Sequence, residues 1–212
     1  RETLVRAVEI GAGHVSAYPL SLEGGTPLAA AVLIGDLAEP DDDVVADMLL
    51  EAEILLGEAG LARYEVANYA RPGHESRHNC AYWTGAEYLG VGPGAHGMLD
   101  ATTARAAGFV VPGEAARVRY AVACEIPGGL TMMPRVDVES LDAREAARED
   151  AMLGLRLVRG IDDALAAQAG VVGVLAELAR DGLVTHEAGR WSTTPRGWLL
   201  VNEVCGRVWA GE

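Results

Sequence analysis

Residues 41–60, DDDVVADMLLEAEILLGEAG, carry a strong helix signal and lie between two segments with strand character. Asp41 to Asp43 can cap the helix and favour the positive end of its dipole. Gly60 stands where a glycine commonly ends a helix, and the apolar residues between them form one face. The flanking segments, HVSAYPL at 14–20 and RYEVANY at 63–69, are strand candidates. A strand–helix–strand order predicts an α/β fold with a parallel sheet.

The pattern changes after about residue 140, where three short helices are expected before a hairpin and a closing helix. The expected helices are 142–158, 162–170 and 171–182, the hairpin turns at 187–190, and the last helix runs from Pro195 to Trp209. This order is typical of a winged-helix-like domain. We therefore expect domains at 1–125 and 140–212, with the boundary at IPGGLTMMPR (126–135) and a loop-rich stretch at 70–115.

Composition excludes several classes of function. All 17 basic residues are arginine, so a lysine Schiff base and a phosphate-loop lysine are ruled out. The net charge of −14 disfavours a polyanionic partner. Residues 142–212 hold eleven acidic residues against eight arginines, and Arg180 is the only base of helix 171–181, so a winged-helix nucleic-acid binder is the third hypothesis. No apolar run reaches the length of a membrane span, and we expect a cytoplasmic protein cut from a longer chain.

The cysteines predict neither a disulfide framework nor a metal site. Cys80, Cys124 and Cys205 are scattered, and none has the close spacing typical of a cluster site. We expect isolated, reduced thiols.

Polar and aromatic side chains are concentrated at 64–97, YEVANYARPGHESRHNCAYWTGAEYLGVGPGAHG. His78 could be an iron ligand or a loop histidine satisfied by hydrogen bonds, and both interpretations stay open. Pro72 and Gly73 argue against a helix that would pair His74 with His78. His96 lies among glycines and has an open approach. For His14 and His186 we expect structural roles.

The segment GPGAHG at 92–97 formally matches a dinucleotide-binding fingerprint. Pro93 lies inside the match, no clear helix follows Gly97, and no acidic residue ends a second strand about 20 residues later, so we reject that interpretation. Glycines in this stretch let the backbone come close to another strand or to a ligand, and both alternatives remain. These glycines are Gly90, Gly92, Gly94 and Gly97.

Four segments together resemble the HemW family of heme chaperones. They are HVSAYPLSLEGGTPLA, the whole 64–97 segment, LGLRLVRGID, and LARDGLV with the later STTPRGWLLVNEV. The family belongs to the radical S-adenosylmethionine superfamily and is related to oxygen-independent coproporphyrinogen III oxidase. The resemblance implies a partial parallel (β/α) barrel followed by a winged-helix-like C-terminal domain.

The resemblance also implies a site. HNCAYW matches the family's H-N-x-x-Y-W motif, which is linked to heme, so His78 becomes the candidate iron ligand. Asn79, Tyr82 and Trp83 would surround the heme. The remaining cofactor-binding residues implied are Gly92, Gly94 and His96, with Tyr18, Pro19 and the His96 loop on the S-adenosylmethionine side of the barrel.

The implied function is heme binding and transfer to apo-hemoproteins, with a coproporphyrinogen oxidase of porphyrin biosynthesis as the alternative. Membrane-associated recipients and a homodimer are open alternatives. The family's C-x-x-x-C-x-x-C cluster motif is absent from this sequence, so we expect the C-terminal part of such a protein. The family's S-adenosyl-L-methionine and [4Fe–4S] cluster are therefore expected only in a longer protein, and this chain alone is expected to be inactive as a radical enzyme.

Overall fold

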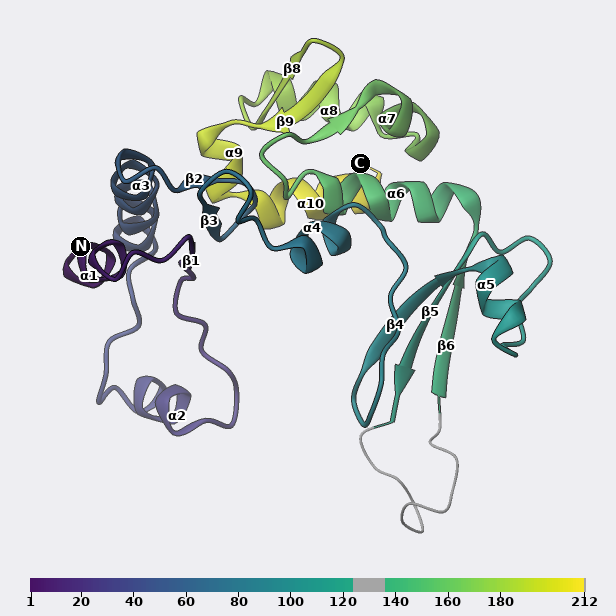
Figure 1. Cartoon of the computed structure of the whole chain (residues 1–212), viewed down its shortest axis with the longest axis horizontal. Helices are drawn as coiled ribbons and strands as arrows, with labels where there is room; N and C mark the ends of the chain where they lie inside the picture. Colours follow the sequence, from purple (N-terminus) through teal and green to yellow (C-terminus); the bar gives the residue numbers. More distant parts are fainter. Residues whose placement is uncertain (124–135, 212) are drawn as a thin grey trace. The chain divides into compact units, whose positions relative to one another are not determined.

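The computed structural model describes residues 1–123 and 136–211 (Figure 1). The chain divides into two compact units, Arg1–Ser76 and Arg77–Glu212. The predicted boundary segment 126–135 lies outside the described residues, so the division into domains 1–125 and 140–212 stays a prediction.

The first unit contains the predicted helix of residues 41–60. In chain order its elements are α1 (Glu2–Glu9), β1 (His14–Ser16), α2 (Pro27–Leu33), α3 (Asp42–Glu58), β2 (Ala62–Arg63) and β3 (Asn68–Ala70). The Asp41 carboxylate accepts hydrogen bonds from two backbone amides at the start of α3, and Gly60 follows its end with a φ of +78°. Both end signals of this helix are confirmed.

The sheet of the first unit corrects the predicted strand pairing. β3 lies in the middle and pairs antiparallel with both β1 and β2. β1 and β2 therefore run in the same direction, as a strand–helix–strand unit requires, but they are not neighbours. The predicted parallel pairing of 14–20 with 63–69 is wrong because the second segment reverses direction and forms a two-stranded hairpin.

The second unit is built from two small antiparallel sheets and several helices. In chain order it contains α4 (Arg77–Trp83), β4 (His96–Asp100), α5 (Ala101–Ala106), β5 (Arg117–Val122), β6 (Val136–Leu141), α6 (Ala143–Gly154), β7 (Ile161–Asp162), α7 (Asp163–Ala169), α8 (Val172–Arg180), β8 (Val184–Glu187), β9 (Arg190–Thr193), α9 (Pro195–Leu199) and α10 (Val201–Ala210). The chain is therefore a mixed α/β protein whose described strand pairs are antiparallel.

The segment predicted to be loop-rich, 70–115, contains regular structure. RHNCAYW forms helix α4, and the residues after GPGA form strand β4. β5 is the central strand of the sheet β4–β5–β6 and pairs with both neighbours. Most of 70–115 nevertheless lies outside helices and strands, in agreement with a loop-rich stretch. The sequence did not indicate α4 and β4, because α4 has only seven residues and β4 depends on a strand distant in sequence.

The C-terminal helices and hairpin occur where the sequence predicts them, with two differences. Asp142 and Glu145 form a capping box at the start of α6, but this helix ends at Gly154 and not at Val158. A Cβ atom at position 154 would lie 2.5 Å from Ile161 Cγ2, so the glycine lets the following chain pack closely. The predicted last helix is divided at Leu200 into α9 and α10.

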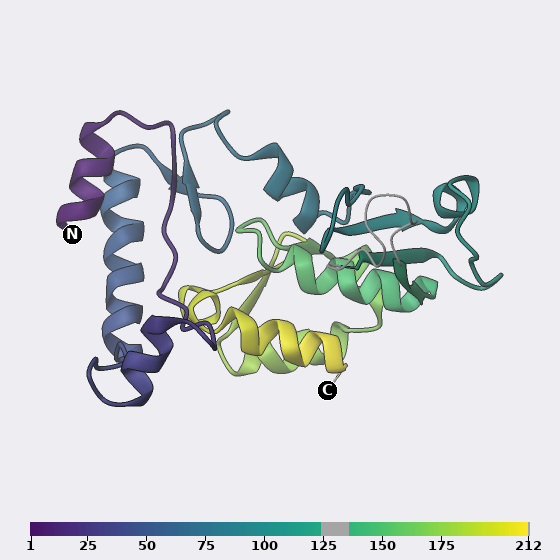
Figure 2. The same cartoon turned by 90° about the horizontal axis from the view of Figure 1, so that it is seen from below.

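Apolar side chains from these helices and the hairpin form the largest core cluster of the described residues. Helix α10 runs alongside α6, as Figure 2 shows. Leu155, Leu175, Leu178 and Val204 are fully buried in this cluster. The cluster holds α6 in place, and α6 also forms one wall of the pocket described next. No described helix combines the length and the apolar character that crossing a membrane requires.

Candidate functional site

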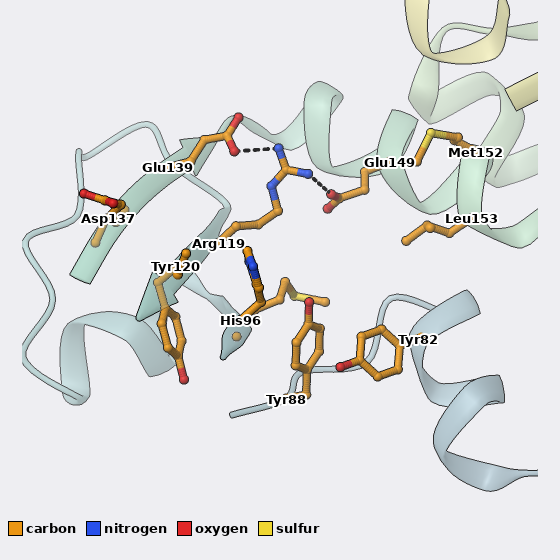
Figure 3. Close-up of a pocket in the computed structure, with 14 residues that line it drawn as sticks. Tyr82, Tyr88, His96, Arg119, Tyr120, Asp137, Glu139, Glu149, Met152 and Leu153 are labelled. Atoms are coloured by element: carbon orange, nitrogen blue, oxygen red, sulfur yellow. Dashed lines mark hydrogen bonds and ion pairs between the residues drawn. The ribbon is translucent and has the colours of Figure 1, made fainter. Parts of the chain in front are cut away.

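The second unit contains a cavity of about 600 Å³ between one face of the β4–β5–β6 sheet, helix α6 and the region of α4 (Figure 3). This volume lies within the range of small-molecule and cofactor pockets. The lining residues are Tyr82, Tyr88, His96, Gly97, Met98, Arg119, Tyr120, Ala121, Asp137, Val138, Glu139, Glu149, Met152 and Leu153.

Strand alternation explains the sheet wall of this pocket. His96 and Met98 are two residues apart on β4, so their side chains leave the strand on the same side. The strand register places His96 beside Ala121, and Met98 beside Arg119. On β6, Asp137 and Glu139 continue these two rows. Residues from three strands therefore meet on one face.

The aromatic wall comes from α4 and the segment that follows it. The rings of Tyr82 and Tyr88 lie 4.4 Å apart, centroid to centroid. His78 is one helical turn before Tyr82, and the centroids of the two rings lie 4.9 Å apart with 62° between the ring planes, an edge-to-face contact. Burial raises the pKa of Tyr88, and Tyr82 and Glu149 act in the same direction, so this phenol stays neutral at physiological pH.

The positive charge in the pocket is already compensated. Arg119 donates hydrogen bonds of 2.6 Å to Glu149 and to Glu139. Burial alone would lower the pKa of Arg119, but these carboxylates outweigh it and the pKa is raised. Because Arg119 is paired on both sides, the pocket is better suited to an apolar or aromatic ligand than to a phosphate group.

Helix α6 is joined to the sheet by a second arginine. Arg117 donates to Glu149 at 2.8 Å and to both carboxylate oxygens of Asp150 at 2.8 and 2.9 Å. Glu149 therefore bridges Arg117 and Arg119, and it is only 5% exposed. This network fixes α6 against β5 and holds the pocket walls together.

The donor atoms around the cavity fit a heme. They are an imidazole (His96), two thioethers (Met98 and Met152) and two phenols (Tyr82 and Tyr88), which are the side-chain types that ligate heme iron. The apolar and aromatic walls also suit a flat macrocycle. Among the described residues, no cluster of three or more His, Cys, Asp or Glu side chains could hold a separate metal ion.

The structure brings some of the predicted site residues together and separates others. Tyr82 and His96 line the pocket. His78 contacts Tyr82 but does not line the pocket, and Asn79 is half-buried on the same helix. Trp83 lines a smaller cavity of about 330 Å³ and lies beneath the Arg156 guanidinium, 5.5 Å from the ring centroid.

Two of the predicted glycines, Gly90 and Gly97, make close approaches to the protein itself. A Cβ atom on Gly97 would lie 2.1 Å from Tyr120 Cζ, and one on Gly90 would lie 2.3 Å from the His96 carbonyl oxygen. Gly92 and Gly94 have φ values of +98° and +72°, and the Gly94 amide donates to the Val122 carbonyl. Gly90 and Gly97 thus approach strand residues, whereas no atom lies within 4 Å of a Cβ atom built on Gly92, and for Gly92 and Gly94 both alternatives stay open.

Tyr18 and Pro19 lie in the first unit. The Tyr18 hydroxyl accepts a hydrogen bond of 3.3 Å from the Asn68 side chain, and Tyr18 is largely exposed. These two residues are not among those that line the pocket of the second unit.

Sequence reasoning missed the walls contributed by the sheet and by α6. Met98, Arg119 and Met152 were not among the predicted site residues. The alternation in HGMLD and RVRYAV is the signal that could have placed the first two on one strand face. Met152 could be found only once α6 was known to cover that face.

Comparison with known proteins identifies the class first. The family model described as "HemN C-terminal domain" matches residues 141–200. In the solved structures, coproporphyrinogen III oxidase (HemN) from Escherichia coli, described as a radical SAM enzyme, matches with a TM-score of 0.66 at 20% identity. The match covers 98% of this chain and 50% of that chain. The second unit thus ends in a HemN C-terminal domain, and the chain has a HemN-like fold.

Sequence relatives identify the type within this class. The chain is 42% identical to the heme chaperone HemW of Mycobacterium tuberculosis over 198 residues, which are 93% of this chain and 48% of that protein. It is 30% identical to the heme chaperone HemW of Bacillus subtilis over 207 residues, which are 94% and 52%. The chain therefore resembles HemW-type heme chaperones in sequence, and it spans about half the length of these relatives.

Proposed function

We propose that this chain carries the heme-binding part of a HemW-type heme chaperone, which binds heme and passes it to apoproteins. The observation that carries the proposal is the cavity where Tyr82, Tyr88, His96, Met98 and Met152 meet. Its two sequence relatives named above are heme chaperones, which supports the same function.

The volume and the side chains of the pocket support heme as the ligand. Heme supplies an iron centre that accepts axial ligands, and its flat macrocycle is largely apolar. Tyr82 and Tyr88 offer aromatic faces to such a macrocycle, while His96 offers an imidazole. The cavity is not enclosed, so the propionates of a bound heme could remain in water.

Helix α4 is the second part of the proposed site. We keep His78 as a candidate iron ligand, with Asn79, Tyr82 and Trp83 around the heme. The H-N-x-x-Y-W motif supports this assignment, as does the ring contact of His78 with the pocket residue Tyr82.

Three further parts of the proposal rest on the family resemblance. Gly92 and Gly94 shape the loop that leads to His96, and Tyr18 and Pro19 face S-adenosylmethionine in the longer protein. Residues 1–125 belong to a partial (β/α) barrel, and residues 140–212 form a winged-helix-like domain. A [4Fe–4S] cluster belongs to the longer protein, because Cys80, Cys124 and Cys205 lack the spacing of cluster ligands.

The partners that we propose are apo-hemoproteins of the cytoplasm, membrane-associated recipients included, and a homodimer is a further option. The alternative function is that of a coproporphyrinogen III oxidase. The fold alone is compatible with it, but the H-N-x-x-Y-W motif and the relatives named heme chaperones favour heme transfer. A nucleic-acid binder is disfavoured by the net charge of −14, and Arg180 is the single basic residue of α8.

A hemin titration of three variants tests the proposal. We expect His78→Ala to weaken binding and to shift the Soret band, because the identity of the axial ligand sets the electronic state of the iron. Trp83→Ala should weaken hemin binding without a shift of the Soret band, since it would remove an aromatic contact with the heme and no bond to the iron. His186→Ala is the matched control, because its ring is bound to Asp163 at 2.8 Å in the C-terminal hairpin region. Unchanged affinity and spectrum in His78→Ala would remove His78 as a ligand.

A further inference from the structure

The side chain of His96 occupies a distinct position in the pocket. It begins β4 and leaves the strand on the face that carries Met98, Arg119 and Glu139. Figure 3 shows its ring between Arg119 and Tyr88. His96 is exposed, so a ligand can approach the ring from the cavity.

The ring nitrogens of His96 are not engaged by the protein. The rings of His14 and His186 are bound to Tyr64 at 2.9 Å and to Asp163 at 2.8 Å. Within residues 1–123 and 136–211, by contrast, the His96 ring makes no hydrogen bond or ion pair. A neutral imidazole with a free nitrogen that faces a cavity is suited to bind a metal.

Several other polar or sulfur-containing side chains of the pocket are less suited to bind iron. The Glu149 and Glu139 carboxylates are bound to arginines. Met98 is 5% exposed, and its thioether would have to leave the packed wall to reach a ligand. A tyrosine ligates iron as phenolate, and burial keeps the Tyr88 phenol neutral.

We infer that His96 is an axial ligand of the heme iron, provided from the sheet side of the pocket. The inference rests on the proposed heme function and adds a ligand on a wall separate from α4. The iron has two axial positions, so a ligand from β4 does not exclude His78 of α4. In this arrangement Tyr82 and Tyr88 contact the macrocycle and give affinity that does not depend on the metal.

The test compares hemin with metal-free protoporphyrin IX, using the whole chain and its His96→Ala variant. Hemin binding is measured by absorption and electron paramagnetic resonance, and porphyrin binding by fluorescence. We expect His96→Ala to lower the hemin affinity by about tenfold or more and to change the spin state, because one iron–imidazole bond is lost. The porphyrin affinity should change by less than about twofold, since a ligand without metal makes no such bond. Added imidazole should restore the spectrum of the variant.

Other outcomes separate this inference from the proposed function. An unchanged hemin spectrum in His96→Ala, with wild-type affinity, would overturn the inference and leave the heme function standing. Equal losses of hemin and porphyrin affinity would also overturn it, because His96 would then act as a wall. If the wild-type chain bound neither hemin nor porphyrin, the proposed function itself would fail. His186→Ala serves as the control and should match the wild-type chain in all measurements.

Discussion

Histidine and tyrosine side chains show how differently single residues are used in this chain. His14 and His186 each have a hydrogen-bond partner, as their predicted structural roles require, and His186 also stacks on Trp191 at 4.1 Å. Tyr69 is fully buried, yet no hydrogen-bond partner for its hydroxyl is present among the described residues. A buried hydroxyl without a partner costs free energy, so this residue offers a direct test of the first unit's core.

We expect Tyr69→Phe to leave the free energy of unfolding unchanged or to raise it at neutral pH, because no hydrogen bond is lost. Burial raises the pKa of Tyr69 from 10.0 to about 12. Above pH 10.0 the phenol therefore ionises in the unfolded state but stays neutral in the folded state. The free energy of unfolding is at its full value below pH 10.0 and falls as the pH rises toward about 12. Tyr69→Phe should lose this alkaline dependence in urea unfolding measured across that range.

Tyr120→Phe is the matched control for this prediction. The Tyr120 hydroxyl accepts a hydrogen bond of 2.8 Å from the Gly90 amide, so its removal should cost about 1 kcal/mol. A larger loss in Tyr69→Phe than in Tyr120→Phe would mean that the Tyr69 hydroxyl does have a partner, and the account of this core would be wrong.

At the level of helices and strands, the sequence predicts where several helices begin, but it does not predict which strands pair. Asp41, Asp142 and Thr194 each cap a helix where the sequence predicts one, because a cap involves residues only two or three positions apart. The sheet β4–β5–β6 and the β1–β3 pairing depend on strands far apart in the chain, which sequence periodicity does not report. Helix α4 was missed because seven residues are too few for a clear periodic pattern.

The contact between β5 and α6 supplies a prediction about stability. Glu149 is buried and bridges Arg117 and Arg119, whereas Glu139 binds Arg119 at the surface. We expect Glu149→Gln to lower the free energy of unfolding by about 2–3 kcal/mol, because two arginines each lose one carboxylate while keeping another. Glu139→Gln removes an exposed pair and should cost less than about 1 kcal/mol.

Urea unfolding of both variants at neutral pH gives the two values directly. Equal losses in Glu149→Gln and Glu139→Gln would show that burial of the bridge contributes nothing to the attachment of α6. A loss confined to Glu149→Gln would identify this carboxylate as the main electrostatic link between the sheet and the helix.

For the whole molecule, the family resemblance indicates the type of protein, whereas the position and the lining of the pocket follow from the structure. Tyr82 and His96 were predicted site residues and lie in one cavity, although 14 positions separate them. Met152 comes from a helix that the sequence assigned to the C-terminal domain, so its place in the same cavity required the three-dimensional arrangement of the second unit. The described part of this unit contains every residue that lines the cavity.

The central claim is that heme binds in this cavity, and Ala121→Trp tests it directly. Ala121 lies on the pocket face of β5 beside His96, so an indole at this position would fill the space proposed for the macrocycle. A hemin titration followed in the Soret region should show saturable binding of one heme to the wild-type chain and a loss of about tenfold or more in affinity for Ala121→Trp. Circular dichroism should confirm that both chains are folded. The absence of saturable binding in the wild-type chain, or equal affinity in the folded variant, would contradict the account.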